Sequence, residues 1–411
     1  MKKAVRHAAV FLSLCCCLIF SFIVYGMSAL PEELAVTEWQ LPVLSAPYSA
    51  EAAETIPGWS ARHASAPSAL QPEQTQQASL KLFRLFPVKS AKITVTRRSY
   101  VTVGGDVFGI KLYTRGVLVA KTDLVSTENG NENPAQQAGL RSGDLITKIN
   151  GAGVNRKSAI ATAIENSGGT PLHLTVERDG SELDVVLTPV RGASDGKYLA
   201  GLWIRDSSAG IGTITFFDGE SNTMAGLGHA ICDVDSGEVI PISGGELVDA
   251  KIMGCYRGVD GTPGELCGVF ESHKLATLER NGGTGVYGEM VVQPKGESLP
   301  VALKTEVKTG PAKVLVTVDG NGANYYDVEI TRVSLSANAN QKNMTLRVTD
   351  PRLIEATGGI VQGMSGSPLV QDGLLVGAVT HVFVSSPLEG YGIFAQTMLE
   401  TARQTAQERA Q

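Results

Sequence analysis

Short runs of alternating apolar residues, separated by glycine turns, dominate the chain from about residue 198 to 395. Four of these runs, at 210–217, 313–318, 326–333 and 374–384, have the two-residue period of a β-strand. The chain holds 46 glycines among 411 residues, where roughly 30 are usual, and glycine closes tight turns at the least steric cost. This pattern predicts an all-β barrel or sandwich for this part of the chain.

The charge balance excludes one large class of partners. Lysine and arginine total 35 against 41 acidic residues, which gives a formal net charge of −6. A chain without an excess of positive charge lacks the electrostatic footprint that holds a nucleic-acid backbone. Hydrophobic residues make up 43% of the chain, so a large folded core is expected. We therefore expect a folded protein that does not bind nucleic acid, and no motif indicates a cofactor.

The N-terminus carries a segment that enters a membrane. Lys2, Lys3 and Arg6 precede an uncharged, apolar stretch from 8 to 25. Its length lies between that of a signal-peptide apolar region and that of a spanning helix, so removal and retention both stay open. The positive charges before it predict that the rest of the chain lies outside the cytoplasm. We assign residues 1–28 to this signal or transmembrane segment and expect an exported or membrane-anchored protein.

Residues 29–95 have the composition of a tether. The segment is rich in Ala, Ser, Pro, Glu and Gln, and it shows little apolar periodicity until 91–96, which alternates like a strand. We expect a low-complexity linker that ends in this lead-in strand.

Residues 96–192 show the pattern of strands interrupted by two short helices. Pro134 can open the first helix and Gly139 can close it, while 158–166 suits the second. A hairpin that turns at 179–180 follows. The stretch resembles a PDZ domain of the bacterial protease-associated kind. The resemblance rests on Pro134-Ala135, Ala138-Gly139-Leu140, Gly143-Asp144-Leu145-Ile146 and Ile149-Asn150-Gly151.

The PDZ resemblance implies that this domain binds an extended peptide as an added strand, with the N–H groups of a glycine loop holding the terminal carboxylate. The loop from Gly104 to Gly109 is the candidate, and Phe108 and Ile110 would line the groove. The predicted peptide-binding residues are therefore Gly104, Gly105, Phe108, Gly109 and Ile110. An αβ domain without a ligand is the alternative, because glycine turns and helix starts serve any small fold.

The sharpest chemical feature is the sequence Gly363-Met-Ser365-Gly-Ser-Pro ahead of an apolar strand. A serine between glycines on a tight turn can expose its Oγ atom while nearby backbone N–H groups converge on one point. The N–H groups of Gly363 and Ser365 are therefore candidates for an oxyanion hole. The motif resembles the nucleophile turn of chymotrypsin-like serine peptidases, and a Gly/Ser hairpin turn is the alternative.

A serine nucleophile needs a histidine to take its proton and a carboxylate to orient that histidine. His229 follows two glycines and precedes Ser365, as in the chain order of chymotrypsin-like enzymes. His381 lies on the strand after Ser365, where a role in the substrate pocket or in packing is the better prediction. Asp350 lies at a strand end shortly before Ser365, and the proline after it fixes the turn. Spacing does not separate it from five rivals: Asp233, Asp235, Asp249, Asp260 and Asp327.

The chain as a whole resembles the stage IV sporulation protein B family of peptidases from endospore-forming bacteria. Besides the apolar segment, the tether and the PDZ motifs, the resemblance rests on 201–213, 226–229, 349–351 and 363–368. It implies a mainly β chain in which the PDZ (α+β) domain at 96–192 precedes a chymotrypsin-like double β-barrel peptidase domain at 193–411. It also implies His229 as general base, Asp350 as orienting acid and Ser365 as nucleophile.

The same resemblance implies the substrates and the place of action. A peptidase of this kind cleaves itself near its N-terminus. It also cleaves a membrane-bound regulator of an intramembrane metalloprotease, in the space between the forespore and mother-cell membranes.

Two interpretations from other classes stay open at this point. One is a non-enzymatic scaffold, in which the PDZ domain binds peptide and the β-domain is inert. The other is a structural zinc site formed by His229, Cys232, Cys255 and Cys267, although these residues lack a Cys-x-x-Cys pair. A disulfide between Cys255 and Cys267 is the better prediction for two of these thiols.

Overall fold

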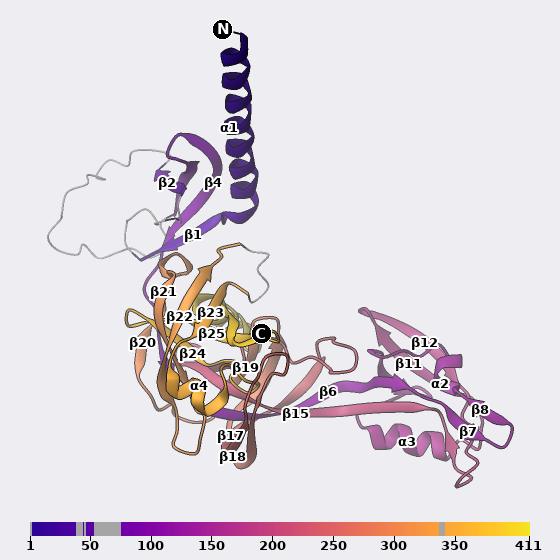
Figure 1. Ribbon diagram of the computed structural model, residues 1–411. Coiled ribbons are helices and arrows are strands. Elements are labelled where there is room, and N and C mark those ends of the chain that lie inside the picture. The colour runs from indigo at the N-terminus through magenta and orange to yellow at the C-terminus, as the bar shows by residue number, and fades with distance from the viewer. Residues whose placement is uncertain (1, 38–43, 45–46, 53–74, 337–341) are drawn as a thin grey trace.

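The computed structural model describes residues 2–37, 44, 47–52, 75–336 and 342–411. Strands dominate it, which confirms the mainly β prediction (Figure 1). The chain begins with helix α1 (Lys2–Ala29), and its segment Val10–Ser28 is the one stretch among the described residues that is long and apolar enough to cross a membrane. In Figure 1 the N-terminal part of this helix projects beyond the rest of the molecule, while its C-terminal part lies beside a small sheet.

A small sheet follows α1 where the sequence predicts a tether. Its strands lie in the order β1-β4-β3-β2. Leu80, Leu82 and Ile93 are buried in it, and Ile19 and Ile23 of α1 pack against this core. The tether prediction is therefore wrong for the first three of these strands in chain order, whereas the fourth contains most of the predicted lead-in strand. In the third strand the buried Ala78 is too small to give a clear apolar pattern. The strands are β1 (Glu33–Val36), β2 (Tyr48–Ala52), β3 (Thr75–Leu82) and β4 (Phe86–Val95), while 53–74 lies outside the described residues.

Strand β6 (Val107–Thr122) takes part in two domains. Its first half, 107–114, pairs on one edge with β15 (Leu202–Asp218) and on the other with β17 (Ile242–Tyr256). The ring closes through β18 (Glu265–Gly282), β19 (Gly285–Met290) and β16 (Thr223–Gly226), which returns to β15. This six-strand ring is the first barrel, with a core that contains Phe108, Met224 and Leu247. Strands β5 (Tyr100–Val103) and β20 (Ser298–Pro300) extend the sheet from β15.

The second half of β6 and the first residues of β15 belong to the PDZ domain. Figure 1 shows the two strands running side by side from the barrel into this domain. Val117, Val119 and Ile204 contact the PDZ core, so this core begins well after the predicted boundary at 96 and extends past the one at 192. Its other main elements are α2 (Pro134–Gln137), β9 (Leu145–Ile149), α3 (Lys157–Glu165), β11 (Leu172–Arg178) and β12 (Ser181–Leu187). Short strands complete it: β7 (Val125–Thr127), β8 (Gly130–Glu132), β10 (Ala152–Gly153), β13 (Val190–Arg191) and β14 (Tyr198–Leu199).

The second barrel is closed, with its strands in the order β21-β22-β23-β26-β25-β24. Inward residues such as Val314, Ile330 and Leu346 form its core. The helix α5 (Ala395–Arg409) packs Met398 and Ala402 against both barrels, as its apolar face predicts. The strands are β21 (Gly310–Val316), β22 (Asn324–Val333), β23 (Met344–Val348), β24 (Pro368–Gln371), β25 (Leu374–Phe383) and β26 (Ser386–Phe394), with η1 (Lys304–Glu306) and α4 (Pro351–Thr357) in the connections.

Candidate active site

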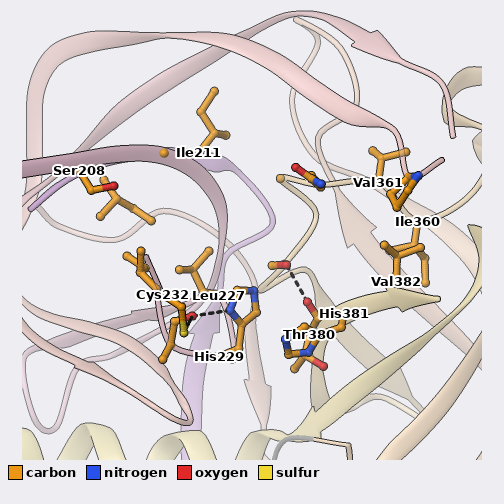
Figure 2. Close-up of a pocket in the computed structure, with 18 of the residues that line it drawn as sticks. Ser208, Ile211, Leu227, His229, Cys232, Ile360, Val361, Thr380, His381 and Val382 are labelled. Atoms are coloured by element: carbon orange, nitrogen blue, oxygen red, sulfur yellow. Dashed lines mark hydrogen bonds between the residues drawn. The ribbon is translucent and has the colours of Figure 1, made fainter. Parts of the chain in front are cut away.

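A cavity of about 530 Å³ lies where the two barrels meet, and Figure 2 shows the side chains around it. His229 reaches it from the first barrel, and Ser365 and His381 reach it from the second. The structure therefore brings these three predicted site residues to one cavity. Aliphatic side chains make up much of the remaining wall: Ile110, Leu112, Ile211, Leu227, Ile360, Val361, Val382 and Val384.

The turn that carries Ser365 is held by its carbonyl groups. The carbonyls of Gly363, Ser365 and Gly366 all accept hydrogen bonds from β15, through the hydroxyls of Thr213 and Thr215 and the N–H of Thr213. Gly363 and Gly366 have φ of +95° and +96°, and a Cβ on Gly366 would lie 2.0 Å from the Thr213 carbonyl oxygen, so glycine is required there.

This turn leaves two backbone donors for a ligand. Within the described residues, the N–H groups of Gly363 and Ser365 have no acceptor, whereas the N–H of Gly366 donates to Val379 at 2.8 Å. Unpaired N–H groups on either side of a nucleophile are what an oxyanion hole needs. The sequence analysis missed Thr213 and Thr215, although two threonines within an apolar run are a signal that could have found them. Both are fully buried in the structure.

The Ser365 hydroxyl donates a hydrogen bond to the carbonyl of Thr380, at 2.7 Å (dashed in Figure 2). Thr380 lies on β25, immediately before His381. The hydroxyl must therefore leave this carbonyl and turn toward His229 before a histidine can take its proton.

His229 is presented by a strained segment. Leu227 and Gly228 both have left-handed backbone conformations, with φ of +65° and +71°. The His229 Nδ1 atom lies 2.8 Å from the carbonyl oxygen of Ala230. A carbonyl only accepts, so Nδ1 carries the proton and Nε2 has its lone pair free, which is the tautomer that a general base needs. Burial lowers the pKa of His229, against a smaller effect of the Ala230 carbonyl, and this favours the neutral ring.

His381 lies against the same ring, with ring centroids 4.6 Å apart and an interplanar angle of 34°. Desolvation by the surrounding wall, followed by the neighbouring His229 and Lys342, lowers the pKa of His381 to about 4. Both histidines are therefore neutral near pH 7. This position fits the predicted place of His381 in the substrate pocket.

Asp350 lies in a different environment from the one predicted. Its carboxylate caps α4 by accepting from the N–H of Arg352, pairs with the Arg352 guanidinium at 2.7 Å, and accepts from the N–H of Asp327. The guanidinium comes first among the causes that lower the pKa of Asp350 to about 2. Among the described residues, the Asp350 carboxylate makes no hydrogen bond or ion pair with His229, because both of its oxygens are used at the start of α4, and Asp350 does not line the cavity.

The rival aspartates do not replace it at the ring of His229. Asp249 pairs with His273 on the surface, and Asp327 lies near Lys313. Asp233 is buried in the loop that follows His229, where it pairs with Arg205 rather than with the histidine. Among the described residues, the partner of His229 Nδ1 is a backbone carbonyl.

The predicted PDZ peptide loop is contradicted by the strand pairing. Gly109 and Ile110 lie on the part of β6 that has neighbours on both edges, so no peptide can add there as a strand. The side chain of Phe108 is fully buried in the core of the first barrel, and Ile110 lines the cavity with Ser365. Gly104 and Gly105 donate their N–H groups to Thr215 and Ile214. The glycine and aliphatic pattern was correct for a strand, but it did not reveal which strands would pair with it.

The zinc alternative has no site in this fold. Within the part of the chain that the structure describes, no group of three or more His, Cys, Asp or Glu side chains is arranged to hold a metal ion. The thiols of Cys232, Cys255 and Cys267 are free, so the predicted disulfide between Cys255 and Cys267 is not formed.

Two parts of the chain match the models of known protein families. Residues 196–399 match the model of the family described as SpoIVB peptidase S55, and residues 131–178 match the PDZ domain model.

Three curated relatives match over short stretches. The regulator of sigma-E protease RseP of Salmonella typhimurium is 36% identical over 73 residues, which is 18% of this chain and 16% of that protein. Serine protease HTRA1 of Xenopus tropicalis is 38% identical over 58 residues, 14% of this chain and 12% of that protein. Zinc metalloprotease RasP of Shouchella clausii is 32% identical over 80 residues, 20% of this chain and 18% of that protein. The chain thus matches less than a fifth of the length of each of these relatives.

Proposed function

Since the chain belongs to the SpoIVB peptidase S55 family and is a serine peptidase by that membership, we propose that it is an exported endopeptidase in which Ser365 is the nucleophile and His229 the general base. One observation carries this assignment. The two side chains come from different barrels into one cavity, beside the unpaired N–H groups of Gly363 and Ser365.

The proposed reaction follows from the donors and acceptors at the site. The Ser365 hydroxyl leaves the Thr380 carbonyl, gives its proton to Nε2 of His229, and attacks the carbonyl carbon of the scissile bond. The negative charge that develops on the substrate oxygen is stabilised by the N–H groups of Gly363 and Ser365. His229 then returns the proton to the leaving amine, and water releases the acyl group in a second cycle.

The wall of the cavity favours apolar substrate residues. No Asp, Glu, Lys or Arg side chain lines it among the described residues, and both of its histidines have lowered pKa values. An apolar side chain that enters loses its contact with water without facing a buried charge. We therefore propose that cleavage occurs next to aliphatic or other uncharged residues.

We place the PDZ peptide site on β15 rather than on β6. Residues 202–208 pair with β6 along one edge only, and within the described chain no strand covers the other edge. The helix α3 lies next to this edge, where the N–H of Lys157 donates to the Asp206 carboxylate at 2.9 Å. An extended peptide can add there as a strand, which is how PDZ domains bind their ligands.

The place of action and the substrates are proposed from the likeness to the SpoIVB peptidase S55 family and from the apolar helix α1. We propose that the peptidase acts outside the cytoplasm during sporulation, in the space between the forespore and mother-cell membranes. Its substrates there are its own N-terminal region and a membrane-bound regulator of an intramembrane metalloprotease.

An active-site-directed fluorophosphonate tests the nucleophile. We expect it to label the wild type and the Ser272→Ala variant, whose serine is exposed on β18, but not Ser365→Ala. Equal labelling of all three proteins would contradict the assignment and favour the non-enzymatic scaffold.

The products test the substrates. Wild type and Ser365→Ala are each incubated with purified ectodomains of candidate membrane regulators, and the fragments are sequenced. We expect cuts next to apolar residues with the wild type alone. Identical N-terminal fragments from the two proteins would refute self-cleavage.

A further inference from the structure

The loop that follows His229 is folded around one buried carboxylate. Asp233 is only 2% exposed, and its side chain accepts hydrogen bonds from the N–H groups of Asp235 and Ser236 and from the Ser236 hydroxyl. Across the same loop, the N–H of Asp233 donates to the Glu238 carbonyl, and the Asp233 carbonyl accepts from the N–H of Gly237, each at 2.8 Å. The position of this carboxylate therefore determines the shape of the whole loop.

The cation that pairs with this carboxylate comes from the PDZ side of the molecule. Arg205 lies on β15, next to Ile204, which packs against the PDZ core. Its guanidinium forks between two carboxylates, with 2.6 Å to Asp233 and 2.6 Å to Asp235. A guanidinium that bridges two carboxylates, one of them buried, fixes the orientation of these groups and also neutralises their charge.

Asn281 holds the loop from the first barrel, and the exposed Glu238 side chain of the loop lies beside the PDZ domain. The side chain of Asn281, on β18 of the first barrel, donates to the carbonyls of Ile231 and Ile240 and accepts from the N–H of Ile231. On the PDZ side, the Glu238 carboxylate lies so close to Gly143 that a Cβ there would be 2.8 Å from it. The loop thus spans the first barrel and the PDZ domain.

The orientation of His229 depends on this loop. The partner of its Nδ1 is the carbonyl of Ala230, which lies three residues before Asp233. In other serine peptidases a carboxylate performs this orienting task. A carbonyl that belongs to the loop moves when the loop moves, so the ring is only as fixed as the loop is.

We propose that Asp233 and Arg205 are positioning residues for the peptidase reaction: their ion pair fixes the loop that orients His229, and it makes strand β15 of the PDZ domain part of the support of the general base. This inference rests on the proposed function, since it assumes that His229 is the base. Neither side chain lines the active-site cavity, so their loss affects the turnover step more than the binding of the scissile segment.

A matched pair of variants in the full chain tests the proposal. Arg205→Ala removes the cation from Asp233, and Arg403→Ala removes the cation from Asp218, a buried carboxylate that does not line the active-site cavity and has a similar set of local donors. We expect Arg205→Ala to lower kcat by about 10- to 100-fold with KM within about twofold, since a misplaced base costs turnover. Arg205→Lys should recover part of this loss, because it restores the charge without the fork.

Arg403→Ala should lower the midpoint of thermal unfolding while its kcat stays within about threefold of the wild type. If the two Ala variants lose kcat in proportion to their loss of stability, the positioning role is wrong. The outcome also separates this inference from the proposed function. Ser365→Ala that retains activity overturns the function itself, whereas an inactive Ser365→Ala together with equal effects of Arg205→Ala and Arg403→Ala overturns only the positioning role.

Discussion

Two turns of the molecule have the same local design and support different things. Asp218 and Ser221 in one, and Asp233 and Ser236 in the other, form Asp-x-acid-Ser sequences in which the serine hydroxyl donates back to the aspartate. In each, an arginine bridges the aspartate and the acid two residues later. The first arginine comes from α5, which packs on the barrels, and the second comes from the PDZ strand β15.

The difference lies in what each arginine connects. Arg403 joins a hairpin, already fixed by two paired strands, to a helix whose apolar face is buried. Arg205 joins an irregular loop, which begins at His229, to a strand of another domain. The same kind of Arg–Asp ion pair therefore adds to global stability at Asp218 and to the geometry of the active site at Asp233. A contact pattern alone does not determine which of these two properties a mutation will change.

The largest expected effect is on stability, at the first turn. Asp218→Ala leaves Arg403 without its buried partner, and we expect the free energy of unfolding to fall by about 3 kcal/mol. Asp233→Ala should lower it by only about 1 kcal/mol, because the loop can open without undoing a barrel. Urea unfolding measures both. Equal losses would remove the distinction between the two turns.

Asp350 offers a third arginine-paired aspartate, and its variant separates a cap from a catalytic acid. Asp350→Asn keeps an acceptor for the first turn of α4 and loses the pairing with Arg352, whose side chain is 67% exposed. We expect about 1 kcal/mol less stability or a smaller loss, and kcat within about tenfold of the wild type. A fall in kcat of about 10⁴-fold would instead restore Asp350 as the acid that orients His229.

The sequence predicts which side chains meet at the cavity better than it predicts the contacts that hold them in place. Ser365 and His229 stand out because glycines around them require special backbone conformations. Asp350 was assigned by family likeness, and spacing along the chain carries no information on whether a carboxylate faces a ring or a helix end. Asp233 was a rival for the same role, and only the folded loop shows that its partner is Arg205.

The pairing of strands was also beyond the sequence. Residues 104–110 have the glycine and apolar pattern of a peptide-binding edge, but the same pattern suits a strand with neighbours on both sides, as β6 has. Between 33 and 95 the inward positions include Ala78 and Ala91, which are buried but too small to mark a strand. Local patterns indicate strands, while long-range pairing decides which edges remain free.

A smaller effect on kcat is expected where the loop that follows His229 approaches the PDZ domain a second time, at Gly143. Gly143 has φ of +91°, and a Cβ there meets only the end of the exposed Glu238 side chain, which can move aside, so Gly143→Ala should lower kcat by no more than about twofold. Gly151→Ala is the control, because Gly151 has a similar φ of +78° and no atom within 4 Å of the added Cβ. Both variants bear a backbone strain of about 1 kcal/mol. If they are equally impaired in peptide cleavage, strain alone accounts for the loss.

The smallest expected effect is a shift in pH dependence. Burial lowers the pKa of His229 below its usual 6.5, so the neutral, active base persists as the pH falls through 6.5 and is lost only at lower pH. The acid limb of kcat/KM should therefore lie below pH 6.5 for the wild type. Arg205→Ala loosens the loop and admits water to the ring, which moves this limb up toward 6.5, while Arg403→Ala leaves it in place. An acid limb of wild-type kcat/KM above pH 6.5 would contradict a buried, neutral base. If the acid limb of Arg205→Ala stays in place, the turn around Asp233 supports the molecule in the same way as the turn around Asp218.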